Sequence, residues 1–409
     1  MKRNRQAFVT MVFIFFVSFF MVVPNQTFAH TSLAHAVPAP DSQLDTSPSE
    51  IILTFSDRLE DRMYEVRLLD QEGKEILSEH AVTISSDRKL LTLQAPSLHD
   101  GVYSVHYQVV SSDGHTLRDS FRFSVGEGDT NLAEANNPSP VYTDALVYFV
   151  RAIYVISLLL LIGWIFWGRF IRNDSETFLK FRHFTVLLLQ IIHLLFLLVM
   201  ILLQTAGLAA GKGDPIMIPI GAGFGFSWLV MLILAFVGFF VLLRSVRLDF
   251  VWIIGLVVAK SFNGHAAAMD PIWFAVLLGG VHVAAAAVWG GGLFFILFSW
   301  KKFHLFIAEL LPIFSKASFT SMFFLWISGG LTAMLYMSDF YELFTTPWGR
   351  LLLLKFLFVL CVTVVASVLR FRIRKGEHAN TLRQWIAVDF GFMAVIAGIA
   401  GVLTYMTTG

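Results

Sequence analysis

The sequence predicts an extracellular all-β sandwich joined to an all-α, polytopic bundle of about eight membrane-spanning helices. Three observations lead to this fold class. A basic N-terminus precedes an apolar run, residues 30–125 alternate apolar and polar side chains, and the rest of the chain is a succession of apolar segments. Of the 409 residues, 56% are hydrophobic and 14% are charged, a composition typical of a membrane protein.

Charge and cysteine content exclude several kinds of function. The formal net charge of +1 gives no reason to expect nucleic acid as a partner. The single cysteine, Cys361, can form neither an internal disulfide nor a cysteine-based zinc or iron–sulfur site. Metal ligands would therefore come from histidine, methionine, carboxylate or backbone groups. The twelve histidines and thirteen methionines become the candidates.

Residues 1–29 are predicted to form a secretory signal peptide. Three basic residues near the start precede an apolar run over residues 8–23, and Thr27-Phe28-Ala29 places small residues where a signal peptidase cleaves. Because the apolar run is slightly long, an uncleaved membrane anchor is the alternative. Cleavage after Ala29 would make His30 the first residue of the mature protein.

Residues 30–125 are predicted to form a small antiparallel β-sandwich. In the run Val102–Val110, apolar and aromatic side chains share one face and polar side chains share the other. This alternation recurs in short runs separated by turn residues, which is typical of sandwiches. The other runs are Ile51–Phe55, Val66–Leu69, Leu90–Leu93 and Ser120–Val125. Residues 126–142, rich in glycine, asparagine and proline, are predicted to be a linker.

Residues 143–409 are predicted to form a transmembrane domain. Basic residues gather after the first, third, fifth and seventh apolar segments, so the positive-inside rule places these loops in the cytoplasm and both mature termini outside. We therefore expect a multi-pass protein of the cytoplasmic membrane. Each segment is close to the roughly 20 residues that cross a bilayer. The eight segments are 143–167, 184–206, 222–243, 248–265, 273–299, 317–338, 350–370 and 385–406.

Two stretches of the outer domain could supply metal ligands. Asp113 and His115 flank Gly114 at the end of a predicted strand, so their side chains can point to the same side. An Asp-Gly turn followed by histidine is also common in ordinary loops. A mature N-terminal His30 would add its α-amine and its ring nitrogen, and this donor set favours tetragonal Cu(II). Because the amine must lose its proton to bind, the affinity should depend on pH. His35 is interpreted as a bystander.

Ionisable residues within the apolar segments are functional candidates, because charge is costly inside a bilayer. His193 and His282 lie near mid-membrane, and His265 ends the fourth segment on the outer side. A neutral histidine hydrogen-bonded between helices is the alternative. Trp289-Gly290-Gly291-Gly292, shortly after His282, would allow close approach of another helix. We expect a metal route past His282 in this region.

Methionines show a weaker pattern at the outer ends of the segments. Met269 follows His265 by four residues, and Met334 and Met337 are three residues apart, so each pair could share a helix face. Thioether sulfur is a soft donor suited to Cu(I). Methionine is also a routine packing residue, so packing is the alternative for all three.

Three stretches of the outer domain occur in a characteristic order and spacing: HTSLAHAVPAPDS over residues 30–42, LTFS over residues 53–56, and VSSDGH over residues 110–115. They resemble the CopC family of secreted copper-binding proteins. The resemblance implies an Ig-like Greek-key sandwich in which His30, Asp113 and His115 bind Cu(II). The methionine-rich strip that some members use for Cu(I) is missing, since Met63 is the only methionine of the domain.

The membrane half is similar to the CopD family. The matching features are Asn263-Gly264-His265, His282 with Trp289-Gly290-Gly291, Phe314-Ser315-x-Ala317, and Thr346-Pro347-Trp348-Gly349-Arg350-Leu351 with Lys355. A CopC domain followed by a CopD domain resembles the YcnJ-type proteins, which are associated with copper import and resistance. The resemblance covers nearly the whole mature chain.

We therefore expect a copper-acquisition protein and not an enzyme. The outer domain would capture Cu(II), the linker would keep it near the bundle, and copper would pass to His265 and Met269 and then past His282. The expected partners are the copper ion, the lipid bilayer and an extracellular copper chaperone. Two alternatives stay open. One is a membrane haem or electron-transfer protein with His193 and His282 as axial ligands, and the other is a resistance or sensing protein that does not transport.

Overall fold

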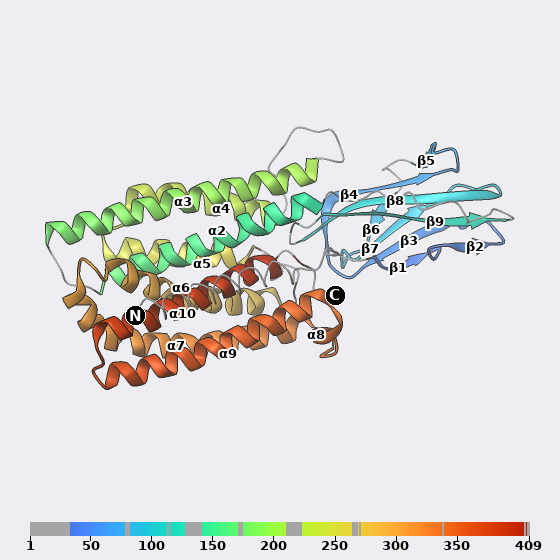
Figure 1. The fold of residues 1–409 in the computed structure, drawn as a ribbon. Coiled ribbons are helices and arrows are strands. Elements are labelled where there is room, and N and C mark those ends of the chain that lie inside the picture. The colour runs from blue at the N-terminus through green and yellow to red at the C-terminus, as the bar shows by residue number, and fades with distance from the viewer. Residues whose placement is uncertain are drawn as a thin grey trace. The chain divides into compact units, whose positions relative to one another are not determined.

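The computed structural model describes most of the chain as strands followed by long helices (Figure 1). The described residues are 33–77, 82–112, 114, 116–126, 141–170, 175–209, 223–263, 269, 271–337, 339–404 and 406. The predicted signal peptide and nearly all of the predicted linker lie outside them. The described part divides into two compact units, one comprising residues 155–189 and 284–409 and the other residues 30–154 and 190–283.

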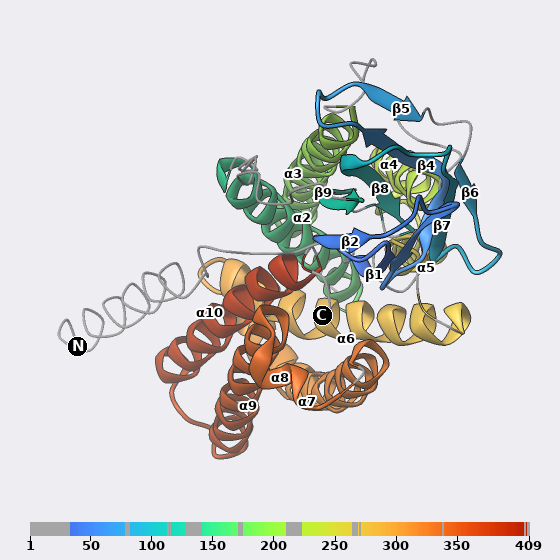
Figure 2. The same cartoon turned by 90° about the vertical axis from the view of Figure 1, so that its right-hand side faces the viewer.

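The N-terminal strands form two sheets that face one another (Figure 2). One sheet has the order β1-β3-β7-β6 and the other has the order β2-β9-β8-β4-β5. Neighbouring strands are antiparallel except for β2 and β9, which are parallel. The strands are β1 (Leu33–Val37), β2 (Ser42–Leu44), β3 (Glu50–Phe55), β4 (Leu59–Leu69), β5 (Glu75–Leu77), β6 (Val82–Ile84), β7 (Leu90–Gln94), β8 (Gly101–Ser111) and β9 (Thr116–Val125).

The apolar faces of the two sheets enclose one core, as the alternation in the sequence predicts. On β8, Tyr103, Val105, Tyr107 and Val109 are all buried, whereas His106 between them is exposed. The ring of Phe55, from the opposite sheet, meets that of Tyr107 edge-on with centroids 5.7 Å apart. Burial of these alternating side chains from both sheets is what holds the sandwich together. The prediction of a β-sandwich is confirmed.

Strand β4 begins earlier than the alternation suggests. The predicted run starts at Val66, but β4 starts at Leu59 and pairs with β8 at Ser111. The pairing register shifts between Leu59 and Tyr64. A bulge of this kind interrupts the two-residue period, because an extra residue moves the following side chains to the other face. The alternation of apolar and polar residues therefore does not predict the first part of β4.

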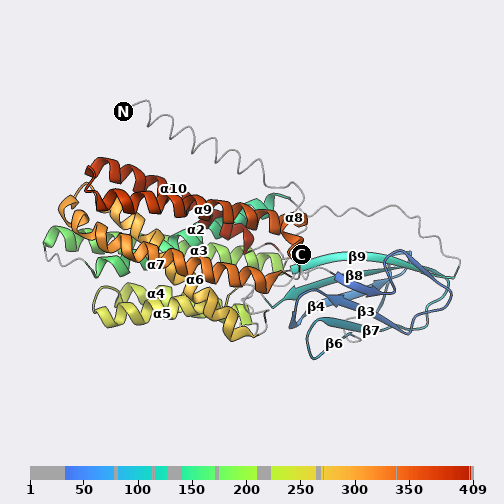
Figure 3. The same cartoon turned by 90° about the horizontal axis from the view of Figure 1, so that it is seen from below.

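The helices follow the predicted apolar segments, but several extend beyond them. They are α2 (Val141–Gly168), α3 (Glu176–Ala209), α4 (Gly223–Val241), α5 (Val246–Ser261), α6 (Ile272–Ser299), α7 (His304–Tyr336), α8 (Glu342–Thr345), α9 (Pro347–Arg374) and α10 (Ala379–Leu403). Within one unit α9 and α10 lie side by side, and within the other so do α4 and α5 (Figure 3). In the second pair, the indole of Trp252 donates to the Leu234 carbonyl at 2.7 Å.

Seven of the described helices are long and apolar enough to cross a membrane: α2, α3, α4, α6, α7, α9 and α10. The predicted fourth span corresponds to α5, which has 16 residues. At 1.5 Å per residue this helix is about 24 Å long, short of the roughly 30 Å hydrocarbon core. The predicted span continued to residue 265, and residues 264–268 lie outside the described ones. The count of eight spans stays a prediction.

Charged residues explain why two helices begin earlier than their apolar segments. Helix α3 starts at Glu176, which forms an ion pair with Lys180 at 2.6 Å. An ion pair at this spacing stabilises a helix while lowering its hydropathy. Helix α7 starts at His304, 13 residues before the predicted segment, and includes Pro312. Because its first half contains charged residues and a proline, a count of apolar residues does not detect the start of this helix.

The first unit is organised around a very close approach of α2 and α6. A Cβ atom on Gly291 would come within 2.5 Å of the Gly163 Cα atom and within 2.8 Å of the Leu159 carbonyl oxygen. A Cβ on Gly163 would in turn meet the Ala287 carbonyl oxygen and the Gly291 Cα atom. The indole of Trp167 on α2 donates to the Val288 carbonyl of α6 at 2.8 Å. The prediction that these glycines permit close helix approach is confirmed.

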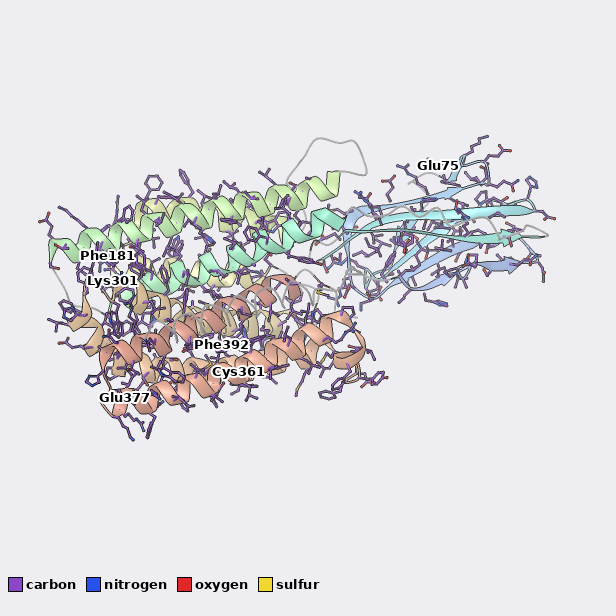
Figure 4. All side chains as sticks on the ribbon, viewed as in Figure 1. Glu75, Phe181, Lys301, Cys361, Glu377 and Phe392 are labelled. Carbon is purple, nitrogen blue, oxygen red and sulfur yellow. The ribbon has the colours of Figure 1, made fainter. Side chains whose placement is uncertain are left out.

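Basic and aromatic residues gather at one end of this unit. Figure 4 labels Phe181, Lys301 and Glu377 there. The Lys302 ammonium lies 5.1 Å from the centroid of the Phe181 ring. Arg372 donates to Glu377 at 2.6 Å across the turn between α9 and α10. These residues belong to the loops for which the positive-inside rule predicts a cytoplasmic location.

We expect Gly163→Ala to lower the stability of the helical domain. The added methyl group meets backbone atoms of α6, which no rotation of a side chain can move aside, and overpacking of this kind costs about 1–3 kcal/mol. Gly398→Ala on α10 is the matched control, since its Cβ would meet nothing within 4 Å, and the alanine should stabilise the helix by up to about 1 kcal/mol. The measurement is the midpoint of thermal loss of helical circular dichroism in detergent. Equal midpoints for the two variants would contradict the close contact.

Reporter fusions test the predicted orientation. A reporter that is active only outside the cell should be active after Gly409 and inactive when inserted at Gly376. Gly376 lies in the turn between α9 and α10, has a φ of +67°, and leaves open space around it. The reason is the cluster of basic residues at the end of α9, which should retain this turn in the cytoplasm. The reverse pattern would mean that the number of spans is odd or the orientation inverted.

Candidate functional site

The three predicted Cu(II) ligands, His30, Asp113 and His115, lie outside the described residues. Their assignment as ligands stays a prediction. The nearest described residues are Leu33 after His30, and Ser112, Gly114 and Thr116 around Asp113 and His115, and these show where the two ligand-bearing stretches join the sandwich. Among the described residues, no group of three or more histidine, cysteine, aspartate or glutamate side chains could hold a metal ion.

Strand register brings the two flanking stretches to one end of the sandwich. Leu33, at the start of β1, pairs with Phe55 at the end of β3. Leu59, four residues later, starts β4 and pairs with Ser111 at the end of β8. The short connection from β3 to β4 therefore lies between the start of β1 and the end of β8. The chain enters β1 and turns from β8 to β9 at the same end of the domain.

Hydrogen bonds to Arg58 and Ser111 hold the turn after β8. The backbone N–H of Ser112 donates to the Arg58 carbonyl at 2.8 Å, and its hydroxyl donates to the same oxygen at 3.1 Å. The N–H of Gly114 donates to the Ser111 carbonyl at 2.8 Å. Gly114 has a φ of +88°, a conformation that favours glycine. The turn between Asp113 and His115 therefore depends on the absence of a side chain at its centre.

The same turn contacts helices of its own compact unit. The Gln204 side chain on α3 donates from Nε2 to the Gly114 carbonyl at 3.2 Å. Its Oε1 atom accepts from the Arg151 guanidinium of α2 at 2.9 Å. A Cβ on Gly114 would lie 3.1 Å from the ring of Phe224 on α4. The amide of Gln204 thus links the turn to α3, on which Gln204 lies, and to α2 through Arg151.

A buried histidine, tyrosine and methionine lie together among the helices of this unit. His193 on α3 is fully buried, and its ring stacks on that of Tyr154 on α2 with centroids 5.4 Å apart. The Tyr154 hydroxyl donates to the Met231 sulfur on α4 at 3.2 Å. Imidazole and thioether are both copper donors, and the thioether suits Cu(I). The sequence does not single out Met231 as a ligand, because it lies within a uniformly apolar helix.

The other residues of the predicted route are placed separately. His282 on α6 and Met269 are half-buried. Met334 on α7 is 61% exposed, and Met337 follows the end of that helix, so the described structure does not gather these two methionines into one buried face. His265 lies outside the described residues. The glycines after His282 are covered: Gly290 by Met393 of α10, Gly291 by α2, and Gly292 by Phe314 of α7 and Trp167.

His106 is a histidine of the outer domain in an unfavourable place for a cation. It lies at the middle of β8, opposite Arg67 on β4. Partial burial, followed by the charges of Arg122 and Arg67, lowers the pKa of its ring. The two guanidinium groups would also repel a metal ion. His106 therefore serves as a control residue for the predicted ligands of the same domain.

Comparisons with known proteins match both halves of the chain. Residues 33–126 match the CopC domain, and residues 308–403 match Copper resistance protein D. The copper transport protein CutJ of Bacillus subtilis is 24% identical over 431 aligned positions, spanning 97% of this chain and 77% of CutJ. Protein YobA of Escherichia coli K12 is 33% identical over 106 positions, spanning 26% of this chain and 85% of YobA.

Among solved structures, the crystal structure of CopC from Methylosinus trichosporium OB3b is 31% identical, covering 25% of this chain and all of that one, with a TM-score of 0.23. Through its N-terminal domain the chain belongs to the CopC family, and the same polypeptide carries a match to Copper resistance protein D. It is a multi-pass membrane protein. The resemblance that its motifs suggest is confirmed.

Proposed function

We propose that this protein imports copper across the cytoplasmic membrane and is not an enzyme. The outer sandwich captures Cu(II), and the helical domain moves copper inward. The relative that spans 97% of the chain is itself named a copper transport protein. The inward direction of transport rests on the domain order. A capture domain that precedes the first span and lies outside the cell would supply copper for import.

The strand register supports the capture step. Leu33 and Ser111 lie at one end of the sandwich through the connection between β3 and β4. His30 precedes the first of these residues by three positions, and Asp113 and His115 follow the second within four. The two stretches that carry the proposed ligands therefore join described strands at the same end of the domain. Together with the N-terminal amine they would offer three nitrogens and one oxygen, a set that suits Cu(II).

The contact at Gly114 supports the proposed transfer of copper from the outer domain to the helices. The turn between two proposed ligands is hydrogen-bonded to Gln204, and Gln204 is hydrogen-bonded to Arg151. A capture site attached to α2 and α3 through this turn would deliver its ion to one place, which would raise the effective concentration of copper there. His265 and Met269 are proposed as outer-side acceptors, and His193 and Met231 as donors further along. Thioether ligands in the membrane domain favour Cu(I), so passage of copper from the Cu(II) capture site to such ligands would require an external one-electron reductant.

Cu(II) affinity should depend on His30 being the first residue. Inserting one alanine between Ala29 and His30, with cleavage still after Ala29, keeps every side chain but separates the α-amine from the His30 ring. Losing one nitrogen donor and its chelate ring should weaken binding on the order of a thousandfold, at about 1.4 kcal/mol per decade. The measurement is a competition titration against a chelator of known affinity, with each N-terminus checked by mass spectrometry.

His106→Ala is the matched control for this titration and should leave the affinity unchanged, because two arginines flank His106. His30→Ala should resemble the insertion. Asp113→Ala should be milder, since it removes one donor only, and His35→Ala should have little effect. Unchanged affinity in the alanine-inserted protein would show that the amine is not a ligand.

Gln204→Leu should slow copper uptake while leaving Cu(II) affinity unchanged. The leucine can neither donate to the Gly114 carbonyl nor accept from Arg151, so the capture site loses its attachment to the helices. Thr205→Val is the control, because the adjacent hydroxyl donates only to carbonyls of its own helix, Ile201 and Leu202. Uptake is measured with purified protein in proteoliposomes loaded with a copper-sensitive dye.

Three results, two from uptake and one from the visible spectrum, would argue against the proposal. Equal uptake by the Gln204 and Thr205 variants would remove the transfer step. No uptake by the unaltered protein would favour a resistance or sensing protein that does not transport. An intense Soret band in the visible spectrum of the purified protein would favour haem ligation instead.

A further inference from the structure

A carboxylate without a partner is buried in the middle of α10. Asp389 is fully buried, and within the described structure neither of its side-chain oxygens has a hydrogen-bond partner. It lies ten residues from the start of the helix, about 15 Å along an axis of 1.5 Å per residue. It is the only acidic residue of the apolar segment 385–406. An ionisable group at this depth is a functional-site candidate.

The described neighbours of Asp389 offer no positive charge. The polar group that faces it is the indole of Trp289 on α6, whose Nε1 atom also lacks a partner at hydrogen-bond geometry. Among the described residues no charged group acts on the carboxyl, and this includes Lys355, within the apolar part of α9. Cys361 on α9 is the other ionisable residue there, and Figure 4 labels it with Phe392 of α10. The segments of α2 and α6 in this unit contain no ionisable residue.

Packing around Asp389 leaves no shell for a metal ion. Met393, one turn further along α10, is 1% exposed, and its sulfur would lie 3.1 Å from a Cβ on Gly290. An alkali or alkaline-earth cation needs several oxygen ligands, and the carboxyl supplies only two. Cu(I) prefers sulfur and imidazole, of which Met393 supplies a single thioether. A proton needs one carboxylate oxygen and no further ligand.

We propose that Asp389 is a proton-binding site of the helical domain and that it exchanges its proton as copper moves. At rest the side chain is the neutral acid, because among the described residues no positive charge faces it and one indole N–H does not offset the cost of burying an ionised carboxylate. When the helices around it rearrange and admit water, the carboxyl releases its proton to solution and later regains one. The coupling to copper rests on the proposed transport function, whereas the protonated carboxyl does not.

Infrared spectroscopy of the full-length protein in lipid tests the proton site directly. The unaltered protein at neutral pH should show the C=O stretching band of a protonated carboxyl. Asp389→Asn should lose that band, and Asp389→Glu should keep a shifted one. Asp249→Asn is the matched control: Asp249 is 1% exposed, but its carboxylate accepts from the Leu243 N–H at 2.8 Å, so its removal should leave the band intact.

Copper uptake in proteoliposomes tests the coupling. Uptake by the unaltered protein should change when a pH gradient is imposed, and Asp389→Asn should lose this dependence while Asp249→Asn keeps it. If the infrared band is absent, or survives in Asp389→Asn, the proton site is wrong. If the band behaves as expected but uptake ignores the gradient, the coupling is wrong. If no copper enters at all and the band is present, the transport function fails and the proton site stands.

Discussion

The close contact between Gly163 and Gly291 is the constraint on which the helical domain depends. Apolar helices gain little from leaving lipid for one another, so their association relies on close packing and on interhelical hydrogen bonds. Two glycines allow α2 and α6 to meet at backbone distance, and the Trp167 indole adds a hydrogen bond to the Val288 carbonyl. Any side chain at either glycine would separate the helices and loosen everything packed on them.

Four successive residues of α6 meet three different helices as a result. Successive residues of a helix point in directions about 100° apart. Trp289 faces Asp389 of α10, Gly290 receives Met393 of α10, Gly291 receives α2, and Gly292 receives Phe314 of α7. The buried acid is thus held against the same turn of helix that organises the packing. A small rotation of α6 would alter its surroundings together with the helix contacts.

The sequence predicts the elements whose apolar pattern is regular. It does not predict the elements in which that pattern is interrupted. Alternation predicts β8 and β9, but not the first part of β4, because a bulge interrupts the period. Apolar length predicts most helices, but not the start of α3, where an ion pair lowers hydropathy. Met231 and Gln204 could not be found, since their roles depend on which helices become neighbours. Asp389 could have been found, because it is the only acidic residue of the apolar segment 385–406.

The strands at the margins of the sandwich are short, which matters for a sandwich carried by a membrane protein. Three of the four marginal strands, β2, β5 and β6, have three residues each, and the fourth, β1, has five. A longer unpaired edge strand can form backbone hydrogen bonds with a strand of another molecule and so begin aggregation. Membrane anchoring aligns neighbouring copies side by side, the geometry most prone to such addition. Short marginal strands would therefore let membrane-anchored copies lie side by side without forming fibres.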